Sequence, residues 1–210
     1  MPAISMSHWN AHQLVALDAE TTGTKPFWHE IIQIGAVALD ANCKPRKNIM
    51  PFDIYLCPEH PERVDPDALK VTGFKLPDLL RKGINPDKAR DLFEQWVGKL
   101  DLGITPAGYP KRIIPLAHNW AFDKPFFQDW LGPAFFNDLI DSRYRDTMTV
   151  SLFLNDHASF HAEKVPYSKN TLGWLCSKLG IEHEFAHNAV QDCLATAECY
   201  HRLCKLGILA

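Results

Sequence analysis

Residues 14–23 read LVALDAETTG, and the rest of the chain is organised around this stretch. Four apolar residues lead into two carboxylates, Asp18 and Glu20, and then into a Thr-Thr-Gly turn. An apolar run that ends at a turn signal predicts a strand buried on both faces. Because side chains alternate along a strand, Asp18 and Glu20 are expected on the same side of it.

Two carboxylates at the end of a buried strand are electrostatically unfavourable. Their charges repel, and removing them from water raises the free energy of the folded protein. A fold tolerates this arrangement when cations lie between the carboxylates, and hard oxygen ligands are what Mg²⁺ and Mn²⁺ bind. We therefore interpret Asp18 and Glu20 as half of a divalent-metal site.

The bulk composition is that of an ordinary globular protein. The 210 residues are 46% hydrophobic and 22% charged, which is enough for one sizeable core. We predict a single domain over residues 1–210, with its core at about residues 12–207. The net charge of -3 gives no global basic field, so any nucleic-acid site must be local. No signal peptide or membrane-length apolar run is visible, so we expect a cytoplasmic protein without a membrane partner.

The six cysteines are expected to be reduced thiols, because no pair forms a C-x-x-C motif and a chain of this size does not need disulfides. Cys193, Cys199, His201 and Cys204 crowd one segment and are zinc-ligand types, but their spacing fits no standard zinc pattern. The favoured interpretation is small core residues on a buried helix.

The order of predicted elements indicates an α/β fold. Three strands joined by short turns form an antiparallel meander, and two later strands alternate with helices. This order predicts a mixed five-stranded sheet, an antiparallel meander followed by parallel strands, flanked by helices. The site is expected at the carboxyl ends of the inner strands. Strands are predicted at residues 12–17, 30–39, 48–56, 113–117 and 139–143, and helices at 66–72, 86–100, 122–131, 147–154, 171–179 and 189–206, with loops at 101–112 and 155–169.

Three further places carry carboxylates or histidines where a strand or loop meets a helix, and strand-end and N-cap roles are sufficient for one of them, Asp141 and Asp146. His118 and Asn119 follow the fourth strand, and Asp123 lies in the first turn of the next helix, where the helix dipole alone would stabilise it. Asp192 lies in the first turns of the last helix, and His187 just before it. Residues five apart do not share a helix face, so His187 must fold back from the preceding loop to join the site.

Four carboxylates and one histidine suit a two-metal phosphodiester hydrolysis. Asp18, Glu20, Asp123 and Asp192 would hold two Mg²⁺ or Mn²⁺ ions about 3.5–4 Å apart, which stabilise the attacking and leaving oxygens of an in-line displacement. His187 would take the proton from the attacking water, because an ordinary histidine pKa lies near neutrality.

Three ordered motifs resemble those of the DEDDh 3′–5′ exonucleases. They are DAETTG at residues 18–23, HNWAFD at 118–123 and HNAVQD at 187–192. The group includes the bacterial polymerase proofreading subunit, RNase T, oligoribonuclease and animal three-prime repair exonucleases. The resemblance covers about residues 14–206 and implies an RNase H-like fold and an enzyme that releases nucleoside 5′-monophosphates.

Carried onto this sequence, the resemblance implies a role for each motif residue. Asp18, Glu20, Asp123 and Asp192 would be metal ligands, with Asp18 bridging both ions, and His187 would be the general base. The gap of four residues between His187 and Asp192 resembles the histidine branch of the family rather than its tyrosine sister.

The resemblance also implies substrate contacts. The backbone around Ala19 and Thr21 would meet the 3′-OH of the terminal nucleotide, and His118 and Asn119 would lie near the scissile phosphate or the nucleotide backbone. Trp28, in a loop with two aromatic residues, is our candidate for an exposed side chain that stacks on bases or acts as a wedge.

The leading hypothesis is a 3′–5′ exonuclease acting on the 3′ ends of DNA, single-stranded because a terminal nucleotide must be unpaired to enter a pocket. One alternative is an exoribonuclease of the same family, since no residue reveals how a 2′-OH would be received. Another, from a different class, is a non-catalytic module that binds nucleic-acid ends. That alternative predicts loss of a carboxylate or of the histidine, and none is lost. Oligomerisation, docking on a larger complex and the biological pathway stay open.

Overall fold

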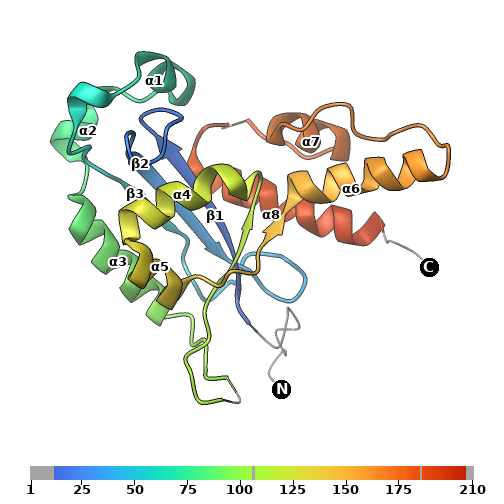
Figure 1. The fold of residues 1–210 in the computed structure, drawn as a ribbon, viewed down its shortest axis with the longest axis horizontal. Helices are drawn as coiled ribbons and strands as arrows, with labels where there is room; N and C mark the ends of the chain where they lie inside the picture. Colours follow the sequence, from blue (N-terminus) through green and yellow to red (C-terminus); the bar gives the residue numbers. More distant parts are fainter. Residues whose placement is uncertain (1–11, 106, 185, 207–210) are drawn as a thin grey trace.

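A five-stranded sheet runs through the centre of the computed structural model, with the order β3-β2-β1-β4-β5 (Figure 1). β1 pairs antiparallel with β2 and β2 with β3, whereas β4 pairs parallel with β1 and β5 with β4. The predicted meander followed by parallel strands is therefore confirmed. The strands are β1 Leu14–Thr21, β2 Ile31–Ala38, β3 Phe52–Tyr55, β4 Ile114–Ala117 and β5 Arg145–Asp146.

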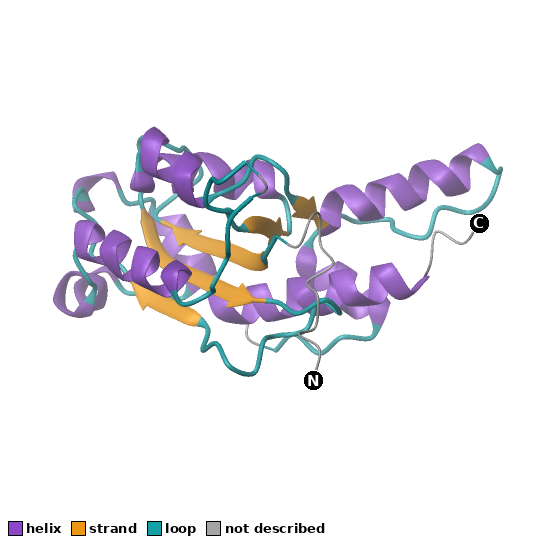
Figure 2. Cartoon of the chain, turned by 90° about the horizontal axis from the view of Figure 1, so that it is seen from below, coloured by secondary structure: helices purple, strands orange, loops and turns teal. Residues whose placement is uncertain are grey.

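Helices cover both faces of this sheet (Figure 2). The structure describes residues 12–105, 107–184 and 186–206. None of the helices in these ranges has the length and apolar content that crossing a membrane requires. The helices are α1 Pro66–Thr72, α2 Leu76–Lys82, α3 Pro86–Gly98, α4 Trp120–Leu131, α5 Pro133–Leu139, α6 Thr147–Phe160, α7 Leu172–Leu179 and α8 Ala189–Leu206, with a 3-10 turn at Pro61–Arg63.

Strand β1 sends alternate side chains into two different cores. Val15 and Leu17 lie in the larger core, with residues of α3, α4 and α5. Leu14 and Ala16 lie in the second core, with residues of α8. All four are fully or almost fully buried, so the predicted burial of this strand on both faces is confirmed. The same alternation places the two carboxylates of β1 on the face that α8 covers.

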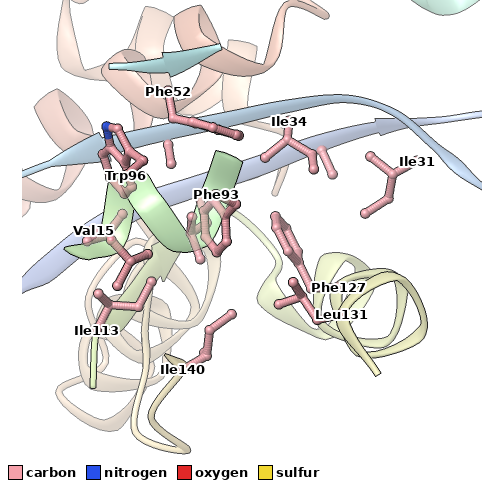
Figure 3. Packing of buried hydrophobic residues seen from close by; sticks show 14 of the residues in the cluster. Val15, Ile31, Ile34, Phe52, Phe93, Trp96, Ile113, Phe127, Leu131 and Ile140 are labelled. Atoms are coloured by element: carbon pink, nitrogen blue, oxygen red, sulfur yellow. The ribbon is translucent and has the colours of Figure 1, made fainter. Parts of the chain in front are cut away.

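The larger core is built from aromatic side chains of α3 and α4. Phe93 and Trp96 of α3 stack with their ring centroids 6.1 Å apart, and Phe127 of α4 lies beside them under the strands (Figure 3). The helical period predicted for α3 is confirmed, because its buried residues recur every three or four positions. This core fixes α4, and with it the turn between β4 and α4, against the sheet.

On the other face, α8 lies very close to β2, because Gly35 has no side chain. A Cβ at Gly35 would lie 2.4 Å from the carbonyl carbon of Ala189 and 2.6 Å from the nitrogen of Val190. Gln33 of β2 also bonds to the start of α8, because its Oε1 accepts a hydrogen bond from the Ala189 N–H at 3.1 Å. The first turn of α8, which carries Asp192, is therefore held close to the sheet.

Replacing Gly35 by alanine is expected to destabilise the protein by about 1–3 kcal/mol, because backbone rather than a flexible side chain must move to admit the methyl group. Urea unfolding measures the change. Gly173→Ala in α7 is the matched control, because a Cβ there meets nothing within 4 Å. Equal effects of the two substitutions would contradict the close approach of α8.

The predicted strand at residues 139–143 is wrong in position. Ile140 forms only an isolated parallel bridge to Ile113, and β5 lies just beyond the predicted range. The residues just before Ile140 belong to α5. After Ile140, the N–H and the guanidinium of Arg143 donate to the Asp141 carboxylate at 2.7 to 2.9 Å. The chain therefore turns before it pairs with β4.

Three helical segments also differ from the prediction. α6 continues to Phe160, so part of the expected loop at residues 155–169 is helical. The Asn155 side chain bonds both the N–H and the carbonyl of Tyr167, which ties α6 to the returning chain. No helix is predicted from the sequence at α2 or α5, and each carries a proline in its first turn, where proline is tolerated. α6, α7 and the end of α8 lie beyond the β5 edge of the sheet (Figure 1).

Candidate active site

Four carboxylates from three separate segments meet near the carboxyl end of β1. Asp18 and Glu20 come from β1, Asp123 from the first turn of α4, and Asp192 from the first turn of α8. Glu20, Asp123 and Asp192 are at most 8% exposed, and Asp18 is half-buried. The structure therefore brings together the four carboxylates that the sequence analysis selected.

Direct contacts connect these segments. The Ala19 N–H of β1 donates to Asp123 Oδ1, with 3.3 Å between nitrogen and oxygen. Ligand atoms of Glu20, His187 and Asp192 all lie within 4.8 Å of one another. His187 folds back from the loop before α8, with a left-handed φ of 64°, and its N–H donates to Asp192 Oδ2 at 3.1 Å. This is the fold-back that the spacing of five residues requires.

Burial and mutual repulsion favour the protonated forms of these carboxyl groups. Burial, followed by the charges of Asp123, Asp192 and Glu20, raises the pKa of Asp18 well above its ordinary value. Burial and the charge of Asp192 raise the pKa of Glu20 to about 7. Burial also raises the pKa of Asp123 and of Asp192, although hydrogen bonds to each offset part of the effect.

The donor set fits a divalent cation. In the ranges that the structure describes, no lysine or arginine forms an ion pair with any of the four carboxylates. A site of hard oxygen donors with raised pKa values and one imidazole within reach is suited to Mg²⁺ or Mn²⁺. A bound cation would favour the charged carboxylates and reverse the pKa shifts.

The metal-free protein is expected to lose stability as the pH rises from about 4.5 to 7. The pKa of Glu20 is raised from 4.5 to about 7, so the folded state binds more protons than the unfolded state in this window. At 1.36 kcal/mol per pKa unit, Glu20 alone contributes about 3 kcal/mol that is lost by pH 8. Thermal unfolding in EDTA at pH 5 and pH 8 measures the loss.

Two controls accompany this measurement. Mn²⁺ should restore the unfolding midpoint at pH 8, and Glu20→Gln should reduce the dependence on pH. An unfolding midpoint in EDTA that is the same at pH 5 and pH 8 would contradict the repulsion.

His118 is engaged within the protein through both ring nitrogens. Nε2 donates to the carbonyl of Asn170, and Nδ1 lies 2.8 Å from Thr147 Oγ1. Burial lowers the pKa of His118. Asn119 sits at the start of α4 with φ of 72°, its side chain makes no capping bond, and its N–H donates to Asp146 Oδ1 at 3.2 Å. His118 therefore holds the turn before α4, and Asn119 lies on that turn.

The remaining predicted contacts lie at the end of β1 and in the loop after it. Thr21 Oγ1 donates to the carbonyl of Gly23 at 2.7 Å, which rigidifies the turn. The loop is held by His29, whose Nδ1 accepts from the Lys25 N–H at 2.9 Å. Trp28 is 53% exposed, and the Arg63 guanidinium lies 4.6 Å from the centroid of its ring. At most one face of this ring is therefore open to a base.

A second histidine, His183, also lies against the carboxylates. Its Nε2 is 2.5 Å from Asp192 Oδ1, and its side chain is 9% exposed. His183 is not among the site residues predicted from the sequence. His183 and Asp192 are nine positions apart in the sequence, and no helical or strand period relates two positions across such a loop.

The cysteines do not form the zinc site considered above. The Sγ atoms of Cys199 and Cys176 are 3.5 Å apart, and the thiol of Cys193 donates to the carbonyl of Gly35. Glu20, His187 and Asp192 are the only group of three or more possible ligands with metal spacing in the described part of the chain. All six cysteines are free.

The model of the exonuclease family RNase T matches residues 15–200. The chain belongs to this exonuclease family. The family recognised from the three motifs is thereby confirmed.

Two curated relatives match this exonuclease chain over part of their own length. DNA polymerase III subunit epsilon of Pasteurella multocida is 29% identical over 193 residues, which cover 89% of this chain and 66% of that protein. The 3′-5′ DNA exonuclease Cap18 of Escherichia coli is 30% identical over 122 residues, which cover 56% of this chain and 58% of that protein. The chain therefore spans about two thirds or less of these two relatives.

Solved exonuclease structures share the fold. Exonuclease I of E. coli, in complex with a dA16 oligonucleotide, superposes with a TM-score of 0.70 at 19% identity. The superposition covers 92% of this chain and 41% of Exonuclease I. The expected RNase H-like exonuclease fold is confirmed.

Proposed function

We propose that the chain is a metal-dependent 3′–5′ exonuclease that acts on single-stranded DNA and releases nucleoside 5′-monophosphates. The observation that carries this proposal is the convergence of four buried or half-buried carboxylates with His187 at the end of β1, in a chain of the exonuclease family. All five groups lie within residues 18–192, which supports a single exonuclease domain.

The four carboxylates would hold two divalent cations, Mg²⁺ or Mn²⁺. Asp18 is the central carboxylate of the set, because the charges of the other three carboxylates all act on it, and it would contribute to holding these ions. When bound, such ions stabilise the charge on the attacking and leaving oxygens of the phosphodiester. Glu20 and Asp192 lie toward the His187 side, and Asp123 is fixed from β1 by the Ala19 N–H.

His187 is the proposed general base. Its ring is exposed, so it can accept the proton of the attacking water and release it to solvent. Its backbone N–H is bonded to Asp192, which keeps the ring next to the carboxylates. Attack on the last phosphodiester of a strand then gives a nucleoside 5′-monophosphate.

The terminal nucleotide would lie against the backbone at Ala19 and Thr21, with Asn119 near the scissile phosphate. The Ala19 N–H is already bonded to Asp123, so this stretch of β1 is rigid when the nucleotide arrives. His118 contributes by holding the turn that carries Asn119, because both of its ring nitrogens are engaged.

DNA is the proposed substrate because of the relatives. The two curated relatives are named as a DNA polymerase subunit and a DNA exonuclease, and Exonuclease I was solved with an oligonucleotide of deoxyadenosine. The match covers about two thirds or less of each of these proteins, so we offer their substrates as support for the proposal.

Trp28→Ala is expected to raise the KM for single-stranded DNA with little change in kcat. Base stacking on an aromatic ring contributes about 1–3 kcal/mol, or roughly 5- to 150-fold. Because Arg63 covers one face of the ring, the lower end of this range is expected. Steady-state kinetics with a labelled oligonucleotide measures both constants, and Tyr144→Ala, which removes an exposed aromatic side chain elsewhere, is the control.

The deciding experiment uses 5′-labelled single-stranded DNA and RNA of the same sequence with Mg²⁺, beside an Asp18→Asn control. A ladder that shortens from the 3′ end on DNA, absent in the control, supports the proposal. A ladder on RNA alone would change the substrate class to that of an exoribonuclease. Tight binding without a ladder would replace the proposal by a non-catalytic end-binding module.

A further inference from the structure

The side chain of His183 is only 9% exposed, yet it makes a single polar contact among the described residues. Its Nε2 lies 2.5 Å from Asp192 Oδ1, and the two side chains are 9% and 10% exposed. Its Nδ1 is buried and has no hydrogen-bond partner in the part of the chain that the structure describes. The one polar contact of His183 is therefore with a carboxylate of the site, which indicates a role beyond filling space.

Asp192 is held from two sides. His183 occupies Oδ1, and the His187 N–H donates to Oδ2 at 3.1 Å. A carboxylate offers about four lone-pair positions. Two therefore stay available for a cation after both hydrogen bonds are made, and the plane of the carboxylate is set by the two donors.

The same two contacts hold the loop before α8. Ile181 is bonded at the start of the loop to the carbonyl of Cys176, and Asn188 at its end accepts from the Asp192 N–H. Between them, the hydrogen bonds shown for the described residues of 182–187 are those of His183 and His187 to the Asp192 side chain. The segment that carries His187 is therefore tied to the site through one carboxylate.

We propose that His183 is a positioning residue that orients Asp192 for cation binding. This inference rests on the proposed function. Partners behind a metal ligand set its orientation, and their loss weakens metal binding by about 10- to 100-fold in known metal sites. His183 is expected to act on this scale.

The test compares two amides at position 183. Glutamine can place its N–H near the position of Nε2, whereas the shorter asparagine cannot, although both are polar. Mn²⁺ binding to the protein without nucleic acid is measured by titration calorimetry. His183→Asn and His183→Ala should bind Mn²⁺ about 10- to 100-fold more weakly than the unchanged protein. His183→Gln should bind nearly as tightly as the unchanged protein.

His201→Ala is the matched control on α8. It removes the hydrogen bond from His201 to the carbonyl of Asn42 and should leave Mn²⁺ affinity unchanged. Urea unfolding in EDTA shows that the variants fold. If His183→Ala does not fold, the comparison of the two amides carries the test.

The outcomes separate this inference from the proposed function. If the unchanged protein binds Mn²⁺, Asp192→Asn does not, and His183→Asn binds as tightly as the unchanged protein, only the role of His183 is overturned. If the unchanged protein binds no Mn²⁺, the proposed metal site fails, and the role of His183 fails with it. Weak binding by His183→Asn with recovery in His183→Gln supports the proposal.

Discussion

Asp18→Asn is expected to lower Mg²⁺-dependent cleavage by at least about 10³-fold while raising the thermal stability of the metal-free protein. The proposed ions would stabilise the transition state by several kcal/mol, and each 1.4 kcal/mol is a factor of ten in rate. Without ions, the same charge is repelled by three neighbouring carboxylates, so its removal stabilises the fold. Cleavage assays and thermal unfolding in EDTA measure the two effects.

Asp78→Asn is the matched control. The Asp78 side chain is exposed on α2, forms an ion pair with Arg81, and is far in sequence from the residues of the site. It should change neither cleavage nor metal-free stability appreciably. Full activity in Asp18→Asn would show that the metal site is wrongly assigned. A lower unfolding midpoint in EDTA would contradict the repulsion between the carboxylates.

His187→Ala is expected to slow cleavage by about 10²- to 10⁴-fold, the range of general acid–base catalysis. Binding of single-stranded DNA and of Mn²⁺ should change much less. The bond from residue 187 to Asp192 is made by the backbone N–H, which the variant keeps, so the loss isolates the ring. Single-turnover rates at saturating enzyme measure the chemical step.

His157→Ala, on the exposed side of α6, serves as the control for removing an imidazole. Partial recovery of the His187→Ala rate by added imidazole would support proton transfer by the ring. A rate equal to that of the unchanged protein would remove His187 from the mechanism.

Much of the site could be predicted because its residues sit where local rules apply. The apolar run before Asp18 predicts a buried strand, and alternation then places Asp18 and Glu20 on one face. Asp192 reaches these two carboxylates because Gly35 lets α8 approach β2. The sequence around Gly35 cannot indicate this approach, because it does not show which segment packs there. The role of His183 could not be predicted from the sequence, because its contact with Asp192 spans a loop in which no helical or strand periodicity relates the two positions.

The errors in the fold have similar causes. The apolar residues before Asp141 suit a helix or a strand, and packing of α5 on the larger core favours the helix. Asn170 is a good N-cap residue, yet Thr171 caps α7, while the carbonyl of Asn170 accepts from His118. A tertiary contact therefore decides between two adjacent capping residues. The prediction for α1 holds, because Asp65 and Gly73 act locally at its ends.

The docking of α8 on Gly35 has a consequence for how the chain matures. Asp192 joins the other carboxylates only when α8 has packed across β2, and α8 follows all five strands in the described part of the chain. A nascent chain that is still emerging from the ribosome can complete the sheet without completing the ligand set. Under the proposed function, a chain in which α8 has not yet packed would lack one of the four carboxylates and would not cleave nucleic acid.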